Sequence, residues 1–271
     1  MEFTLHKDWN KALGTELILL SVLIDFGVKQ LNINQNLNNK NFDCYKRIFN
    51  IQELKINQVD PALLRNIINP HDLFKIYSPY YKIPKVQKKK TFIGIASYQS
   101  SEVIEPNNTT YPNCKIYSID QYAELYEFIK ISGYDVISLD SRDISIEDKA
   151  RLISEYCECV IGYEGGIAHL CHMLDVPYIM FPWHLDNIIF DSKLLHIDNK
   201  TYFLDSFEEF LSWSPAKLNQ CIEELHAGFT NNELVHNPGL ILDRFQTGNN
   251  GNEFMTHEEK QFLSKKYPIL K

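Results

Sequence analysis

The fold of this chain is decided by one stretch, which reads Val160-Ile161-Gly162-Tyr163-Glu164-Gly165-Gly166-Ile167-Ala168-His169-Leu170. Together with Cys159, its first residues form a short apolar run of the kind that fills a buried strand of a parallel sheet. Two glycines follow, and a helical pattern begins at Gly166 and runs to Leu174. The stretch therefore predicts a strand, a tight turn and a helix.

The same alternation continues on both sides of this stretch. Strands are expected at 92–96, 136–139, 159–162 and 177–181, and helices at 118–131, 145–156 and 166–174. Ser118 with Gln121 is a capping pair at the start of the first helix, Ser145 with Asp148 is another at the start of the second, and Gly133 ends the first helix. Strands that alternate with helices predict an α/β fold, with helices on the faces of a parallel sheet and right-handed crossovers.

The flanking regions are less regular. Strands are expected at 3–6, 28–33, 52–56 and 202–204, helices at 16–26, 61–68, 206–211, 216–226 and 257–267, and an Asn-rich loop at 34–41. Prolines, tyrosines and a run of lysines between 78 and 90 suggest a connection between domains. We expect a small N-terminal domain, 1–84, and a C-terminal domain, 85–271, whose last helix packs back on the first domain.

Composition disfavours several classes of function. The 271 residues carry a formal net charge of −8, so a broad basic surface for nucleic acid is not expected. The apolar run 17–26 contains Asp25 and is shorter than the roughly 20 apolar residues that a membrane span requires. We therefore expect a cytoplasmic protein without a membrane span, and peripheral contact with a membrane stays open.

Cysteines and histidines near the central stretch raise the question of a metal site. Cys157, Cys159, His169, Cys171 and His172 are close in sequence. Their spacing does not match the paired ligands of structural zinc sites. No metal is expected.

The glycine turn is the strongest candidate for chemistry. In an open α/β sheet, ligands bind beyond the carboxyl ends of the strands, where the turn from Tyr163 to Gly166 is expected. Consecutive glycines let a ligand approach the backbone, and the free amides at a helix start favour phosphate. His169 lies one turn into the helix. The same pattern also fits a tight turn followed by a core histidine, and its spacing matches neither the P-loop nor the dinucleotide fingerprint.

The segment from Glu164 to Leu170 resembles the D-[ST]-G-x-x-H-[LI] signature of the lipopolysaccharide heptosyltransferases, which are glycosyltransferases of the two-domain GT-B architecture. Met173–Phe181 resembles the continuation A-L-G-x-P-x-x-x-L-F of that family, and Lys115-Ile116-Tyr117 resembles its K-x-W. The resemblance covers Phe92 to Trp183. Glu164 replaces the aspartate of the family, Gly165 replaces its hydroxyl residue, and the region before Phe92 is short for an acceptor domain.

The resemblance implies a GT-B-like fold of two Rossmann-like domains with parallel sheets, the N-terminal one reduced. It implies inverting, metal-independent transfer of a sugar from a nucleotide diphosphate sugar to a hydroxyl of a glycan or glycoconjugate, with no further cofactor. The donor would be bound by residues of two loops and the glycine turn: Ser97, Gln99, Ser100, Lys115, Glu164, Gly165, Gly166 and His169.

The catalytic base is expected from the N-terminal part. Residues 13–19 resemble the M-G-D turn that carries the catalytic aspartate of the family, which makes Glu16 the expected general base and Asp8 the second candidate. His184 and Asp186 follow a predicted strand and are expected to touch the donor nucleoside or sugar. Two alternatives stay open: a nucleotide-sugar epimerase, and a homologue that binds a nucleotide or carbohydrate without turnover.

Overall fold

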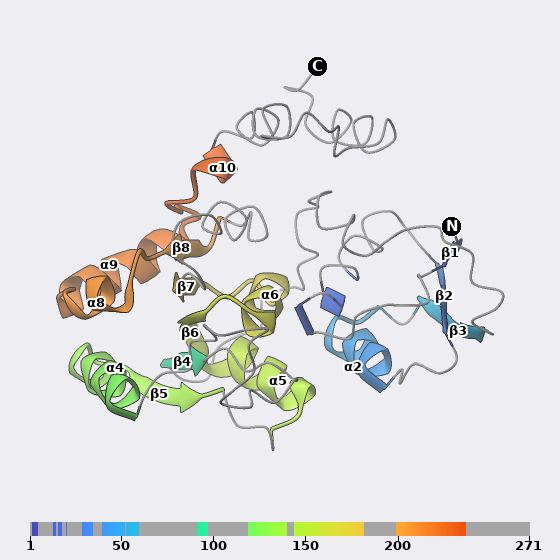
Figure 1. Ribbon diagram of the computed structural model, residues 1–271, viewed down its shortest axis with the longest axis horizontal. Helices are drawn as coiled ribbons and strands as arrows, with labels where there is room; N and C mark the ends of the chain where they lie inside the picture. Colours follow the sequence, from blue (N-terminus) through green and yellow to red (C-terminus); the bar gives the residue numbers. More distant parts are fainter. Residues whose placement is uncertain are drawn as a thin grey trace, which may run out of the picture.

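The computed structural model describes residues 2–4, 13–14, 16–17, 20, 29–34, 40–51, 53–59, 91–96, 119–139, 144–181 and 199–236. Its largest sheet has five strands, β4 (Phe92–Ala96), β5 (Asp135–Ser138), β6 (Cys157–Tyr163), β7 (Tyr178–Phe181) and β8 (Thr201–Phe203). All neighbouring pairs are parallel, in the order β5-β4-β6-β7-β8 (Figure 1). The expected α/β fold with a parallel sheet is therefore confirmed.

Helices cover both faces of this sheet (Figure 1). One face carries α4 (Ile119–Ile131), α8 (Phe207–Leu211) and α9 (Pro215–His226), and the other carries α5 (Ile146–Tyr156) and α6 (Gly166–Met173). The short helix α10 (Glu233–His236) follows α9. The central strand β6 is sandwiched between the two layers, because Cys159 and Ile161 enter one apolar cluster and Val160 enters the other. Burial on both faces explains why this strand is an uninterrupted apolar run in the sequence.

Local sequence signals predicted where several of these helices and strands begin and end. The Ser145 hydroxyl accepts a hydrogen bond of 3.0 Å from the Asp148 amide, as a capping residue does. Gly133 follows α4 with a φ of 93°, a left-handed conformation that favours glycine. The strands β4 and β7, and the helices α4, α5 and α6, lie within about a residue of their predicted bounds.

The N-terminal part contains a second parallel sheet, in the order β1-β2-β3. The elements with described bounds are β1 (Glu2–Thr4), β2 (Gln30–Asn34), α2 (Lys40–Ile48) and β3 (Lys55–Val59). Of a further helix, called here the N-terminal helical segment, the structure describes residues 13, 14, 16, 17 and 20.

Several predicted bounds were wrong in this N-terminal part. The loop predicted at 34–41 loses Asn34 to β2 and its last two residues to α2, and the third strand begins at Lys55 rather than at residue 52. Residues 13 and 14 are already helical, before the helix start predicted at Glu16. Because asparagine is unfavourable in helix interiors, the Asn-rich sequence before α2 did not predict the start of this helix. The helices expected at 61–68 and 257–267 lie outside the described residues.

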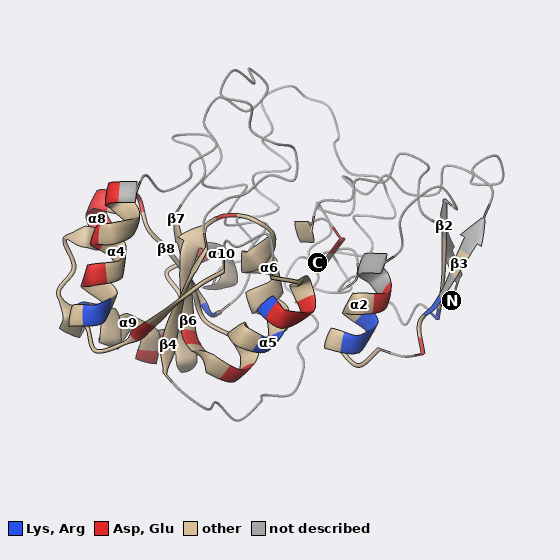
Figure 2. Cartoon of the chain, turned by 90° about the horizontal axis from the view of Figure 1, so that it is seen from below, with Lys and Arg blue, Asp and Glu red and all other residues tan. Residues whose placement is uncertain are grey.

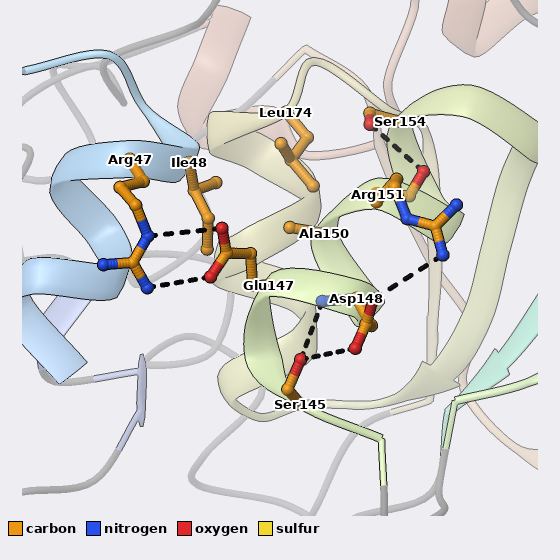
Figure 3. A pocket seen from close by; sticks show the side chains of 9 residues that line it. All are labelled: Arg47, Ile48, Ser145, Glu147, Asp148, Ala150, Arg151, Ser154 and Leu174. Carbon is orange, nitrogen blue, oxygen red and sulfur yellow. Dashed lines mark hydrogen bonds and ion pairs between the residues drawn. The ribbon is translucent and has the colours of Figure 1, made fainter. Parts of the chain in front are cut away.

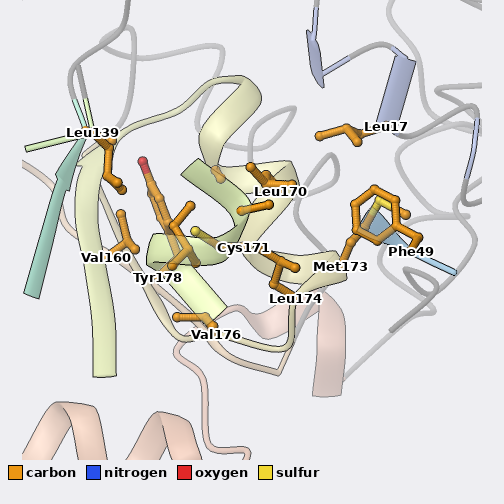
Figure 4. Packing of buried hydrophobic residues seen from close by; sticks show 14 of the residues in the cluster. Leu17, Phe49, Leu139, Val160, Leu170, Cys171, Met173, Leu174, Val176 and Tyr178 are labelled. Atoms are coloured by element: carbon orange, nitrogen blue, oxygen red, sulfur yellow. The ribbon is translucent and has the colours of Figure 1, made fainter. Parts of the chain in front are cut away.

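One apolar cluster joins this N-terminal part to the larger sheet. Leu17 and Phe49 are fully buried in it beside Met173 and Leu174 of the α6 region (Figure 4). At the protein surface, the Arg47 guanidinium pairs with the Glu147 carboxylate at 2.8 Å, and this ion pair also links α2 to α5. The domain boundary expected at 84–85 lies outside the described residues.

The outer edge of β8 is covered by side chains from the segment after α9. The Asn231 amide donates to the Phe203 carbonyl at 2.7 Å, and its oxygen accepts from the Phe203 amide at 2.8 Å. The Thr230 hydroxyl donates to the Thr201 carbonyl. These two side chains therefore take hydrogen bonds that a neighbouring strand would otherwise make.

Acidic side chains are spread over α4, α5, α8 and α9, and basic ones are sparse on these helices (Figure 2). This distribution agrees with the net charge of −8. In the part of the chain that the structure describes, no helix combines the length and the apolar character needed to cross a bilayer.

The shared cluster makes a test of stability possible. Phe49→Ala should lower the free energy of unfolding by about 3–5 kcal/mol, because it opens a cavity between the N-terminal part and α6. Phe229→Ala is the matched control, since Phe229 is 66% exposed and its loss should cost under about 0.5 kcal/mol. Urea unfolding of the three proteins measures both values. Equal small losses would mean that the two parts do not share a core.

Candidate functional site at the β6–α6 turn

The glycine turn lies where a parallel sheet of this order binds ligands. Counted along the chain, the five strands are ordered 2-1-3-4-5, so the chain changes its direction of travel between β4 and β6. Loops that leave neighbouring strands at such a switch point diverge to opposite faces and open a crevice beyond their carboxyl ends. The turn Glu164–Gly165 leaves β6 at this place and leads directly into α6. The topology of the sheet therefore makes this turn a candidate ligand-binding site.

The backbone of the turn is fixed to the sheet, and its N-cap residue supplies no side-chain cap to the helix. The Glu164 amide donates to the Phe181 carbonyl at 3.2 Å, which fixes the turn to the end of β7. Gly165 occupies the N-cap position in extended conformation and supplies no side-chain cap to the first amides of α6. Amides at a helix start that receive no side-chain cap are the groups that bind phosphate in other α/β proteins.

The N-terminal helical segment packs onto this helix start. A Cβ placed on Gly166 would lie 2.8–2.9 Å from three atoms of the Leu13 side chain. A Cβ placed on Gly14 would lie 2.6 Å from Cδ2 of the His169 ring. Both glycines thus permit a close approach of two helical segments that are about 150 residues apart in the sequence. The space beside Gly166 is filled by Leu13, and this is a packing role that the sequence pattern did not reveal.

His169 is buried at this junction. The residue is 4% exposed, and its ring meets the His172 ring edge-on, with centroids 6.2 Å apart. His172 in turn lies 3.5 Å from the Thr201 hydroxyl and packs against Tyr178. This burial fits the interpretation of His169 as a core histidine, and its contact with a phosphate stays a prediction.

Glu16 is enclosed rather than open to solvent. The residue is 2% exposed, and its carboxylate accepts a hydrogen bond of 2.7 Å from the Tyr45 hydroxyl. Burial raises the pKa of Tyr45 far above its ordinary range, and the Glu16 carboxylate raises it further. Tyr45 is therefore protonated at neutral pH, as its hydrogen bond to Glu16 requires. Sequence reasoning missed Tyr45, because the pairing joins two helical segments and leaves no local signal.

A separate hollow of about 540 Å³ lies between α2 and α5 (Figure 3). Its charged side chains neutralise one another: Arg47 contacts Glu147 at 2.8 Å, and Asp148 contacts Arg151 at 3.5 Å. Its two basic side chains are thus each paired with a carboxylate of the protein. Of the expected site residues that the structure describes, none lines this hollow.

The expected site residues are thus only partly placed. Gly166 and His169 lie together at the start of α6, with Glu164 and Gly165 in the turn before it. Glu16 lies in the same helical segment as Gly14, which contacts His169. The other expected residues lie outside the described part of the chain: Asp8, Ser97, Gln99, Ser100, Lys115, His184 and Asp186.

Within the described residues, no group of three or more His, Cys, Asp or Glu side chains is placed to hold a metal ion. Burial raises the pKa of the Cys171 thiol well above its usual value, and the nearby Cys157 and Cys159 raise it further. The Cys171 thiol is therefore protonated at neutral pH.

The sequence matches no model of a known protein family, and comparison with curated proteins finds no significant match.

Tyr45→Phe should lower the free energy of unfolding by about 1.5–3 kcal/mol, because it removes a buried hydrogen bond to a carboxylate. The difference from the native protein should shrink above about pH 10. Above this pH, Tyr45 ionises in the unfolded state of the unsubstituted protein. It does not ionise in the folded state, where its pKa is raised. The native protein therefore loses stability as the pH rises, and the variant lacks this loss.

Urea unfolding at about pH 8 and about pH 11 measures this difference. Tyr126→Phe is the matched control, since Tyr126 is 39% exposed and its replacement should cost under about 0.5 kcal/mol at pH 8. A difference between native protein and Tyr45→Phe that is the same at both pH values would contradict the burial of Tyr45 against Glu16.

Proposed function

We propose that this protein is a glycosyltransferase of GT-B type that binds a nucleotide diphosphate sugar at the β6–α6 turn. The observation that carries the proposal is the position of this glycine turn at the switch point of a five-stranded parallel sheet. A diphosphate at this place would meet the first amides of α6 and the positive end of its dipole. The residues from Glu164 to His169 also carry the resemblance to the heptosyltransferases.

The proposed reaction is an inverting transfer that needs no metal. The oxygen of an acceptor hydroxyl attacks C1 of the donor sugar, and the bond from C1 to the diphosphate oxygen breaks. The leaving nucleoside diphosphate takes the bonding electrons, and a carboxylate takes the proton of the acceptor. Amides of the helix start, His169 and Lys115 would stabilise the charge on the leaving diphosphate, which is the task of a metal in other transferases.

The contact between residues 13–14 and α6 supports a role for the N-terminal part in this reaction. Gly14 touches the His169 ring, and Glu16 lies two residues further along. A carboxylate from this segment, Glu16 or Asp8, is the proposed base. The acceptor would be a glycan or glycoconjugate presented from the N-terminal side, and the reaction would take place in the cytoplasm.

A binding protein without turnover is the second candidate, and one observation favours it. Glu16 is 2% exposed and its carboxylate bonds to Tyr45, whereas a general base must come within hydrogen-bond reach of the acceptor hydroxyl. Release of nucleoside diphosphate from a donor sugar only when an acceptor is present would support transfer. Binding of the donor with no release would support the second candidate.

Nucleotide binding is tested first. In a thermal-shift panel of UDP-, GDP-, ADP- and CMP-sugars, a cognate donor at about 100 times its dissociation constant should add about 2.7 kcal/mol of stability. For a chain of this size, this corresponds to a rise in Tm of roughly 5–10 °C. His169→Ala should bind the same donor more weakly. The absence of a shift with every nucleotide sugar would count against the proposed site.

Glu16→Gln tests the base. The Gln side chain keeps the shape and can still accept the Tyr45 hydrogen bond, but it cannot take a proton. If Glu16 is the base, the rate of transfer should fall by about 10²–10⁴-fold while donor binding is retained. Asp8→Asn should show this loss instead if Asp8 is the base. Glu223→Gln, on the exposed side of α9, is the control and should transfer normally.

A further inference from the structure

Gly14 and the His169 ring are in direct contact. A Cβ on Gly14 would lie 2.6 Å from Cδ2 and 3.1 Å from Nε2 of that ring, and 3.5 Å from the Gly166 Cα. The first of these distances is shorter than packed carbon atoms allow. No residue other than glycine therefore fits at position 14 unless the imidazole or the whole helical segment moves.

The imidazole also has a second buried ring beside it. The His172 ring meets it edge-on at 80°, with centroids 6.2 Å apart. His172 is 1% exposed and is itself fixed between the Thr201 hydroxyl and the Tyr178 ring. The His169 ring thus packs against a second buried imidazole and also lies beside the backbone of Gly14. A side chain at position 14 would therefore have to displace close-packed core residues or rotate the His169 ring.

The helical segment that carries Gly14 cannot easily withdraw. Leu13 fills the space beside Gly166, and Leu17 and Leu20 are fully buried in the apolar cluster. The hydrogen bond from Tyr45 to Glu16 ties the same segment to α2. The backbone of Gly14 is therefore a fixed surface rather than a mobile neighbour.

We propose that Gly14 is a positioning residue for His169, and that the N-terminal helical segment thereby forms part of the nucleotide-diphosphate site. The inference rests on the proposed function, because it assigns His169 to the donor diphosphate. Gly14 itself does not contact the ligand. Its lack of a side chain sets where the imidazole lies relative to the first turn of α6, and this position decides how well the diphosphate is bound.

The test is a double-mutant cycle in the full-length chain with Gly14→Ala, His169→Ala and the double variant. Tm and the affinity for UDP, GDP, ADP and CDP are measured for each protein. Gly14→Ala should lower Tm and should weaken binding of the cognate diphosphate by about tenfold, the loss expected when a charge-assisted hydrogen bond is misplaced. In the His169→Ala background, the same change should raise Tm, because the ring is gone and alanine favours the helix more than glycine does.

Affinity in the double variant should equal that of His169→Ala alone, since one imidazole carries both effects. Gly166→Ala is the matched control. Its Cβ would meet Leu13 rather than the ring, so that Leu13→Ala should restore its Tm and His169→Ala should not. If Gly14→Ala does not fold, adding His169→Asn makes room for the methyl group and keeps a donor. This pair should fold and should bind the diphosphate more tightly than Gly14→Ala with His169→Ala.

Three outcomes would overturn the inference. Binding by Gly14→Ala that equals binding by the native protein would remove Gly14 from the site and leave the proposed function intact. Losses of affinity that simply add in the double variant would show that Gly14 acts independently of His169. No binding of any diphosphate by the native protein would remove the proposed function and the positioning role together, even if the Tm values still show coupling between Gly14 and His169.

Discussion

The burial of β6 on both faces is the constraint on which the rest of this structure depends. Val160 points into the cluster shared by α5, α6 and the N-terminal part, whereas Cys159 and Ile161 point into the cluster under α4, α8 and α9. A strand without an exposed face requires a helical layer on each side. One of the helices that cover β6, α6, begins directly beyond its carboxyl end, at the glycine turn. The helix that starts at the candidate site therefore also covers the central strand of the core.

The sequence predicted the larger sheet because its signals are local. The apolar runs of β4, β6 and β7, the cap at Ser145 and the left-handed Gly133 each depend on neighbours within a few residues. The N-terminal part was predicted less well. The start of α2 was hidden by an asparagine-rich stretch, and its tertiary contacts, Tyr45 with Glu16 and Phe49 with the α6 region, decide its structure more than its propensity does.

The candidate site, too, could be predicted only where its signals are local in the sequence. The glycine turn and His169 could be recognised from a strand, two glycines and a helix in succession. The role of Gly14 and Leu13 could not, because it arises from contacts across about 150 residues of chain. Gly166 is the instructive position: the sequence suggests room for a ligand, and the structure fills that room with Leu13. A glycine can mark close packing of two helices as well as the approach of a ligand.

The side chains that cover β8 also affect how this protein meets other copies of itself. An unprotected edge strand offers its amides and carbonyls to any other strand, which is a common start of aggregation. In β8, the Asn231 amide group imitates the backbone of a neighbouring strand at Phe203, and Thr230 occupies the carbonyl of Thr201. A strand from a second molecule would first have to displace these bonds, so the sheet is closed to growth in that direction.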